Sequence, residues 1–192
     1  EDQRAAFKFG DLITRNNDEL VANLGNLVHR TMTFAHKYLD GVVPPQGEPG
    51  DEDRAQLEAA AALPEKVAAE LEQHRFKAAL QVVMAAAKNT NRYFDHRKPW
   101  ALRKEDMAAC ATVVNVLLNT IHTLGVVMEP FLPFAADKVA AMLGCGPDEP
   151  AWARATDPLP EGRALGEPKI LFRKLDPLPD SEELEASPGE GN

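Results

Sequence analysis

The stretch from His74 to Lys104 concentrates positive charge around a tryptophan. It holds eight Lys or Arg and one acid, Asp95, so its formal charge is +7, whereas the whole chain carries −9 and the remainder −16. A protein that is acidic over most of its length and basic in one segment can admit a polyanion at that segment. The pattern favours a nucleic-acid site, although a charge run is also typical of a solvated helix face. The basic residues are Arg75, Lys77, Lys88, Arg92, Arg97, Lys98, Arg103 and Lys104.

Trp100 follows Pro99 within this basic segment. Proline lacks a backbone donor and disfavours helix at the residue before it, so we predict that the ring is presented from a turn between two helices. A tryptophan among cations can stack on an unpaired base for roughly 1 to 3 kcal/mol while the cations hold phosphates. Partial burial of the ring between helices is an equally good interpretation of this position alone.

Asn26 and Arg30 are four residues apart and therefore point the same way on a helix. The amide offers both a donor and an acceptor, and the guanidinium offers a planar fork of donors, so together they suit the Watson–Crick edge of a base. Taken alone, the pair is better explained as ordinary helix-surface polarity. Its occurrence in the same chain as the Trp100 segment favours base recognition.

The composition indicates a helical protein. The chain has 192 residues, of which 44% are hydrophobic and 6% aromatic, and Ala and Leu dominate the apolar residues. Apolar residues that recur at spacings of three and four predict five helices. We expect Asn16 and Asn17 to cap the first helix and Pro64 to kink or break the second. The predicted helices are 16–39, 51–73, 76–94, 106–128 and 132–143.

Three further parts surround the predicted bundle of residues 16–143. Residues 1–15 are expected to lead in from a preceding domain, because the chain begins with Glu rather than Met. Residues 144–176 are expected to be irregular and to pack back on the bundle, with 169–175 as a short strand or a docked segment. Residues 177–192 are predicted to form a disordered acidic tail.

Several classes of protein and site are disfavoured. We find no apolar stretch of membrane-spanning length and no signal peptide. Cys110 and Cys145 form no CxxC pair, so we predict no disulfide framework, no zinc site, and a reducing compartment such as the cytoplasm. The chain shows no paired carboxylates, no Gly-rich phosphate loop, no nucleophile arrangement and no ligand spacing among its five histidines. We therefore predict no catalytic residue, no metal site and no cofactor in this chain.

Four blocks of the sequence resemble the anticodon-binding domain of methionyl-tRNA synthetase. Their order and approximate spacing agree with that family, and residues 166–175 are similar to the segment that closes this domain. The resemblance covers about residues 7–176 and is closest to the archaeal and eukaryotic cytosolic branch. The blocks are Glu19–Arg30, Tyr38–Pro44, Asn91–Asp95 together with Lys98–Trp100, and Met128–Pro133.

The resemblance implies an all-α helical bundle and a set of tRNA-reading residues. In this family an asparagine and an arginine one helical turn apart, with a tryptophan preceded by proline, read the CAU anticodon. Asp95 matches a position tied to anticodon discrimination, whereas Arg92 and Tyr93 are equally consistent with a scaffold role. The matching readers are Asn26, Arg30, Pro99 and Trp100, and the cations that we expect to steer phosphates are Lys88, Arg92, Arg97, Lys98, Arg103 and Lys104.

The resemblance also implies a larger class I ligase. The His-Ile-Gly-His and Lys-Met-Ser-Lys-Ser types of ATP-binding block do not occur in the 192 residues, so we expect this chain alone to be inactive. A catalytic domain of the same polypeptide would then join methionine to tRNA(Met) with ATP and Mg²⁺. Two alternatives stay open: the equivalent domain of a Leu, Ile or Val ligase, against which the Lys-Pro-Trp and Asn-Leu-x-x-Arg patterns argue, and a non-catalytic RNA-binding or protein-docking module.

Overall fold

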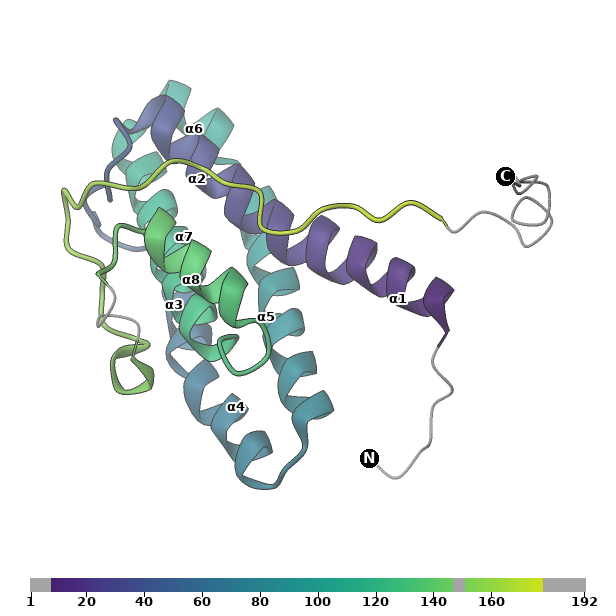
Figure 1. The fold of residues 1–192 in the computed structure, drawn as a ribbon. Helices are drawn as coiled ribbons and strands as arrows, with labels where there is room; N and C mark the ends of the chain where they lie inside the picture. The colour runs from purple at the N-terminus through teal and green to yellow at the C-terminus, as the bar shows by residue number, and fades with distance from the viewer. Residues whose placement is uncertain (1–7, 147–150, 178–192) are drawn as a thin grey trace, which may run out of the picture.

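The computed structural model describes residues 8–146 and 151–177, which form an all-helical bundle (Figure 1). The five predicted helical units are present, and a short helix, α6, is added between the third and the fourth. The predicted tail after residue 177 lies outside the described residues. The helices are α1 Phe9–Arg15, the π-helix η1 Asn16–Gly25, α2 Asn26–Tyr38, α3 Asp51–Ala61, α4 Leu63–Glu72, α5 Phe76–Arg97, α6 Pro99–Glu105, α7 Met107–Val127, α8 Pro133–Met142 and the 3-10 helix η2 Trp152–Arg154.

The first helix begins earlier than the sequence predicts. Helices α1, η1 and α2 follow one another without a break, so part of the expected lead-in is helical, and residues 1–7 of it lie outside the described part. Asn16 and Asn17 do not cap this helix but lie within it, where their side chains bind the C-terminal backbone. The amide of Asn16 donates to the carbonyl of Arg173 (3.0 Å), and that of Asn17 donates to the carbonyl of Leu175 (2.8 Å).

Helix α7 is the central helix of the bundle and contacts α3, α5, α6 and α8. It contains no Asp, Glu, Lys or Arg, and by length and composition it could cross a membrane, contrary to the sequence prediction of no such stretch. However, 94% of its most apolar window is buried inside the protein. A helix that is apolar on all sides can be surrounded by other helices, and α7 is therefore the core on which the others pack.

Two prolines set helix boundaries near the site. Pro64 lies at the start of α4, and α3 ends just before it, so the predicted break is confirmed. Pro99 begins α6, where the sequence predicted a turn, and Lys98 alone, with φ of +46°, redirects the chain from α5 into α6. Proline is favourable in the first turn of a helix because its missing N–H would have no helical partner there. Trp100 is therefore presented by a helix rather than a turn.

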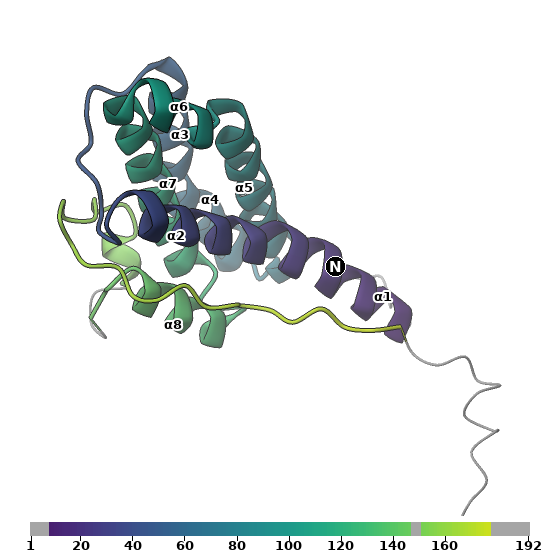
Figure 2. The same ribbon diagram turned by 90° about the horizontal axis from the view of Figure 1, so that it is seen from above.

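The chain after α8 returns across the bundle as an extended segment, residues 163–175, which we call the C-terminal strap. Figures 1 and 2 show it running beside α2, η1 and α1. Two backbone hydrogen bonds hold its start against the loop after α2: Val43 donates to Arg163 (2.9 Å) and Leu165 donates to Gly41 (2.8 Å). The strap contains no strand, so of the two predicted states it adopts the docked one.

Candidate nucleic-acid interface

Two contacts with α5 hold Arg30 in place. Its Nη2 atom donates to Oδ1 of Asp95 at 2.7 Å, and its guanidinium carbon lies 3.9 Å from the centre of the Phe94 ring. The side chains of Arg30 and Asp95 are 26% and 59% exposed, so this pair adds only about 0 to 1 kcal/mol to stability. Its effect is on geometry, because it fixes the plane of the guanidinium while leaving other N–H donors for a ligand.

Trp100, which lies on α6, packs against the same phenylalanine. Its ring stacks on Phe94 with 5.9 Å between ring centres and 27° between planes, while 41% of the residue remains exposed. Pro99, directly before it, is buried. The half-exposed ring can therefore receive a further planar group, as base stacking requires.

Asn26 lies one turn before Arg30 and is exposed. Its amide makes no hydrogen bond to any residue of the described ranges and is free to meet a ligand. The helix that carries it is locked to α5 by Asn91, whose amide donates to the backbone carbonyl of Asn23 at 3.0 Å, and by Asn23, whose amide donates to the carbonyl of Met84 at 3.0 Å. Asn26 and Arg30 thus have a fixed position relative to α5.

The residues around Tyr93 anchor α5 to α3. The Tyr93 hydroxyl donates to Oδ1 of Asp53 at 2.6 Å, and Nη2 of Arg97 donates to Oδ2 of the same carboxylate at 3.1 Å. Burial, together with the hydrogen bond to Asp53, raises the pKa of Tyr93 far above its ordinary value, so the phenol keeps its proton and its bond. Asp53 is 1% exposed, and the sequence analysis missed it because an acid in the first turn of a helix is normally a surface residue.

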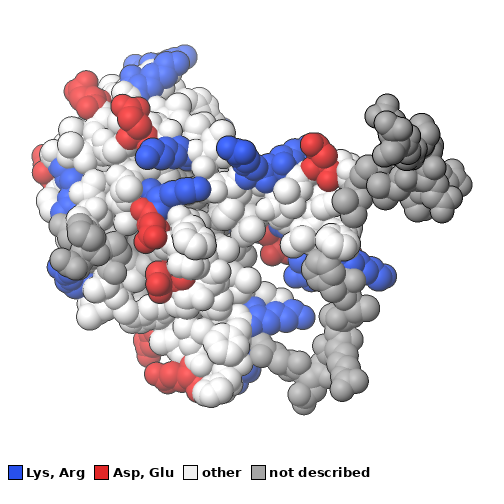
Figure 3. All heavy atoms as spheres, viewed as in Figure 1, with Lys and Arg blue, Asp and Glu red and all other residues white. Residues whose placement is uncertain are grey.

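The three lysines of the predicted steering set are available to phosphates. Lys88, Lys98 and Lys104 are exposed, and none forms an ion pair with a described residue. Figure 3 shows basic side chains at the upper end of the molecule, where Figure 1 places α6, with acidic side chains beside them. Other basic side chains are scattered over the same view, so the cations beside α6 form a small group rather than a continuous basic face.

The three arginines of the predicted steering set are differently placed. Arg97 pairs with the buried Asp53, which partly neutralises its charge, and its steering role stays a prediction. Arg103 lies over the ring of Tyr38, with 4.2 Å between the guanidinium carbon and the ring centre. Arg92 lines an open hollow between α3 and α5. Arg103 therefore packs on the scaffold, whereas Arg92 is exposed and forms no ion pair with a described residue, so it is as available to a phosphate as the lysines.

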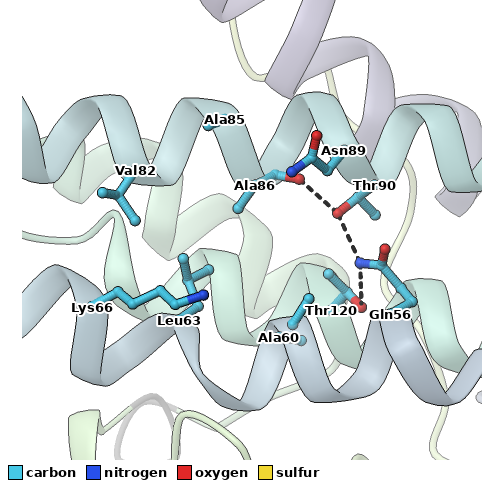
Figure 4. Close-up of a pocket in the computed structure, with 11 residues that line it drawn as sticks. Gln56, Ala60, Leu63, Lys66, Val82, Ala85, Ala86, Asn89, Thr90 and Thr120 are labelled. Carbon is cyan, nitrogen blue, oxygen red and sulfur yellow. Dashed lines mark hydrogen bonds between the residues drawn. The ribbon is translucent and has the colours of Figure 1, made fainter.

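A separate cavity of about 230 Å³ lies between the α3–α4 pair and α5. Figure 4 shows the hydrogen bonds at one end of it: the Gln56 amide donates to the Thr90 hydroxyl (3.1 Å), which donates to the carbonyl of Ala86 (2.8 Å). None of the predicted site residues lines this cavity. Across residues 8–146 and 151–177 no three His, Cys, Asp or Glu side chains are grouped so as to hold a metal ion.

Comparison with known proteins identifies the family. The family model described as the anticodon binding domain of methionyl tRNA ligase matches residues 43–186. The chain belongs to this family. The matched range of the anticodon-binding domain includes Asp95 and Trp100, whereas Asn26 and Arg30 precede it. The match confirms the predicted family and favours it over the Leu, Ile or Val ligase alternative.

Curated relatives of the domain extend the likeness to the N-terminal helix. It is 42% identical over 175 residues to the methionine–tRNA ligase of Pyrococcus abyssi and 42% identical over 173 residues to that of Porphyromonas gingivalis. These alignments cover 91% and 88% of this chain but only 24% and 25% of the relatives, so the chain spans about a quarter of their length.

A solved structure supports the fold of the domain. The apo methionyl-tRNA synthetase of Mycobacterium tuberculosis matches it with a TM-score of 0.86 at 30% identity, over 90% of this chain and 36% of that one. The all-α bundle predicted from the sequence is confirmed.

Proposed function

We propose that this domain binds tRNA(Met) by reading its CAU anticodon. The observation that carries the proposal is that Arg30 and Trp100 both contact the ring of Phe94. The amide of Asn26, which makes no hydrogen bond within the described residues, lies one helical turn before Arg30. An amide, a guanidinium and a half-exposed indole at one end of a bundle supply hydrogen bonds and stacking to an unpaired base.

The steps follow from the positions of these side chains. Lys98 and Lys104 attract the anticodon loop, whose bases unstack to reach the protein. Trp100 stacks on one splayed base, and Arg30, held in plane by Asp95, meets a base edge. A matched set of hydrogen bonds is worth about 1 to 3 kcal/mol of discrimination, by analogy with base readout in grooves.

We infer that the whole protein is a methionine–tRNA ligase, as its curated relatives are named. ATP and Mg²⁺ would be bound by a catalytic domain of the same polypeptide, and this chain would select the tRNA. We place the parent protein in the cytoplasm; Cys110 and Cys145 are not joined by a disulfide, which agrees with a reducing compartment.

The test is binding of the chain to a labelled RNA hairpin with the CAU loop and to one with a changed anticodon, followed by fluorescence anisotropy at low salt. Trp100→Ala should weaken binding of the CAU hairpin by about 10- to 100-fold, because one base–indole stack is worth about 1 to 3 kcal/mol. Trp152→Ala is the matched control, since Trp152 is 37% exposed and lies on η2 rather than at the site.

Arg30→Ala in the same assay should remove most of the preference for the CAU hairpin while the circular dichroism spectrum stays helical. Equal binding of both hairpins by the unmodified chain would make it a nonspecific RNA-binding module. No binding of either hairpin would favour the protein-docking alternative.

A further inference from the structure

Phe94 is a residue that both proposed base readers touch, although the sequence analysis gave it no role. It lies on α5 and is 3% exposed. The guanidinium of Arg30, from α2, lies 3.9 Å from its ring centre, and the indole of Trp100, from α6, stacks on it at 5.9 Å. Three helices thus meet at one ring.

The ring offers each partner an interaction that depends on its being aromatic. A guanidinium is attracted to the negative face of an aromatic ring and settles parallel to it. A second aromatic ring packs best in an offset stack, which fixes its plane as well as its distance. An aliphatic side chain of similar volume would fill the same space but would hold neither plane.

The position of Phe94 is itself fixed. The neighbouring Tyr93 bonds to the buried Asp53 at 2.6 Å, and the following Asp95 bonds to Arg30 at 2.7 Å. Phe34 also lies edge-on beside the ring, with 6.4 Å between the ring centres, but the two sequence neighbours of Phe94 fix its position. A shift of either reader is therefore resisted by a ring that cannot itself move freely.

We propose that Phe94 is a positioning residue that couples the two readers, so that Arg30 and Trp100 recognise the anticodon as one unit. This inference rests on the proposed function. Phe94 itself does not contact RNA, because it is covered by the two side chains that do. An RNA base that stacks on Trp100 holds the indole in place. Because the indole and the Arg30 guanidinium both lie on the Phe94 ring, the base also favours the plane in which the guanidinium meets the base edge.

The first experiment compares Phe94→Leu with Phe34→Leu in the two-hairpin binding assay, using the full chain. Both changes remove a buried ring from the same cluster, but Phe34 has no ring contact with Arg30 or Trp100 among the described residues. Phe94→Leu should reduce the ratio of affinities for the CAU and changed hairpins by about tenfold, and Phe34→Leu should leave that ratio within about twofold. Phe94→Met serves in place of Phe94→Leu if the latter does not melt cooperatively.

The second experiment is a double-mutant cycle. With Phe94 present, the effects of Arg30→Ala and Trp100→Ala on CAU affinity should be non-additive, and in the Phe94→Leu background they should add. If the non-additivity of Arg30→Ala and Trp100→Ala is the same in the Phe94→Leu background, the proposed coupling is wrong.

A measurement without RNA separates this inference from the proposed function. In a Trp152→Phe background, acrylamide quenching reports on Trp100 alone. Phe94→Leu and Arg30→Ala should each raise the quenching of Trp100. If the unmodified chain discriminates between the hairpins and Phe94→Leu does so equally well, the coupling is wrong and the anticodon-reading proposal stands. If the unmodified chain does not discriminate, both proposals fail.

Discussion

At the scale of single residues, the site depends on a buried carboxylate that never faces a ligand. Asp53 is 1% exposed and accepts hydrogen bonds from Tyr93, from Arg97 and from the backbone N–H of Gly50. A buried charge is tolerated only when it is fully paired, and these donors come from α5 and from the start of α3. The carboxylate therefore sets the position of the α5 segment that carries Phe94 and Asp95.

Tyr93→Phe should lower the free energy of unfolding by about 1.5 to 3 kcal/mol at pH 8, because it removes a hydrogen bond to a charged group. The folded-state pKa of Tyr93 is raised, chiefly by burial, so its contribution to stability is complete below the unfolded pKa near 10 and is lost as pH rises above it. The difference between the unmodified chain and the variant should therefore shrink by about 1.4 kcal/mol per pH unit above that point.

Urea unfolding between pH 8 and pH 11 measures this difference. Tyr38→Phe is the control, because Tyr38 is the other of the two tyrosines and its hydroxyl makes no hydrogen bond within the described residues. A gap between the unmodified chain and Tyr93→Phe that stayed constant with pH would mean that Tyr93 ionises like an exposed phenol.

At the scale of elements, the N-terminal helix and the C-terminal strap hold each other. Asn17 makes a two-way contact with Leu175, donating to its carbonyl at 2.8 Å and accepting from its N–H at 2.9 Å. Phe172 packs against Gly25, where an added Cβ would lie 3.3 Å from the ring. The strap thus lies against the helix that carries Asn26 and Arg30 along much of its length (Figure 2).

Asn17→Ala should loosen the end of the strap without unfolding the bundle. Loss of two exposed hydrogen bonds of about 1 kcal/mol or less each should speed local opening by roughly five- to tenfold. Trypsin cleaves after Arg173 and Lys174, so the rate of cleavage at these two sites reports the opening. Asp18→Ala, a change at the next and exposed residue, should leave the rate unchanged, and an equal acceleration by both variants would contradict the role of Asn17.

The elements also show what could be predicted from the sequence. The apolar periodicity identifies the outer bundle helices because each buries one stripe, whereas α7 is buried on nearly all sides. The break at Pro64 follows from its missing donor. Asn16 and Asn17 were interpreted as caps because their partners, Arg173 and Leu175, are more than 150 residues away. Local sequence rules contain no information about such a contact.

The site could be predicted only in part, because some of its residues act through contacts between distant parts of the sequence. The types and spacing of Asn26, Arg30 and Trp100 were visible in the sequence, and the resemblance gave them roles. The importance of Phe94 and Asp53 was not visible in the sequence. A phenylalanine on an apolar stripe is normally a core residue, and an aspartate at a helix start is normally exposed. Their roles come from pairs that only the fold brings together.

At the scale of the whole molecule, a net charge of −9 makes most of the surface repel RNA, and attraction depends on a few exposed cations. Lys88, Lys98 and Lys104 are exposed and form no ion pairs with described residues, so each can release one counterion on meeting a phosphate. Affinity for the CAU hairpin should then fall steeply with salt, although the protein as a whole is acidic.

Lys104→Gln should reduce the slope of log affinity against log salt by about 0.7, the value expected for one phosphate contact on a single strand, while the preference for the CAU hairpin stays the same. Lys66→Gln provides the matched control, because Lys66 is also exposed but lies on α4, at the opposite end of the bundle from α6 in Figure 1. Titrations at four or five salt concentrations give both slopes. Equal reductions for the two variants would show that net charge, rather than a phosphate site beside Trp100, governs binding; a changed preference in Lys104→Gln would make Lys104 a base reader instead.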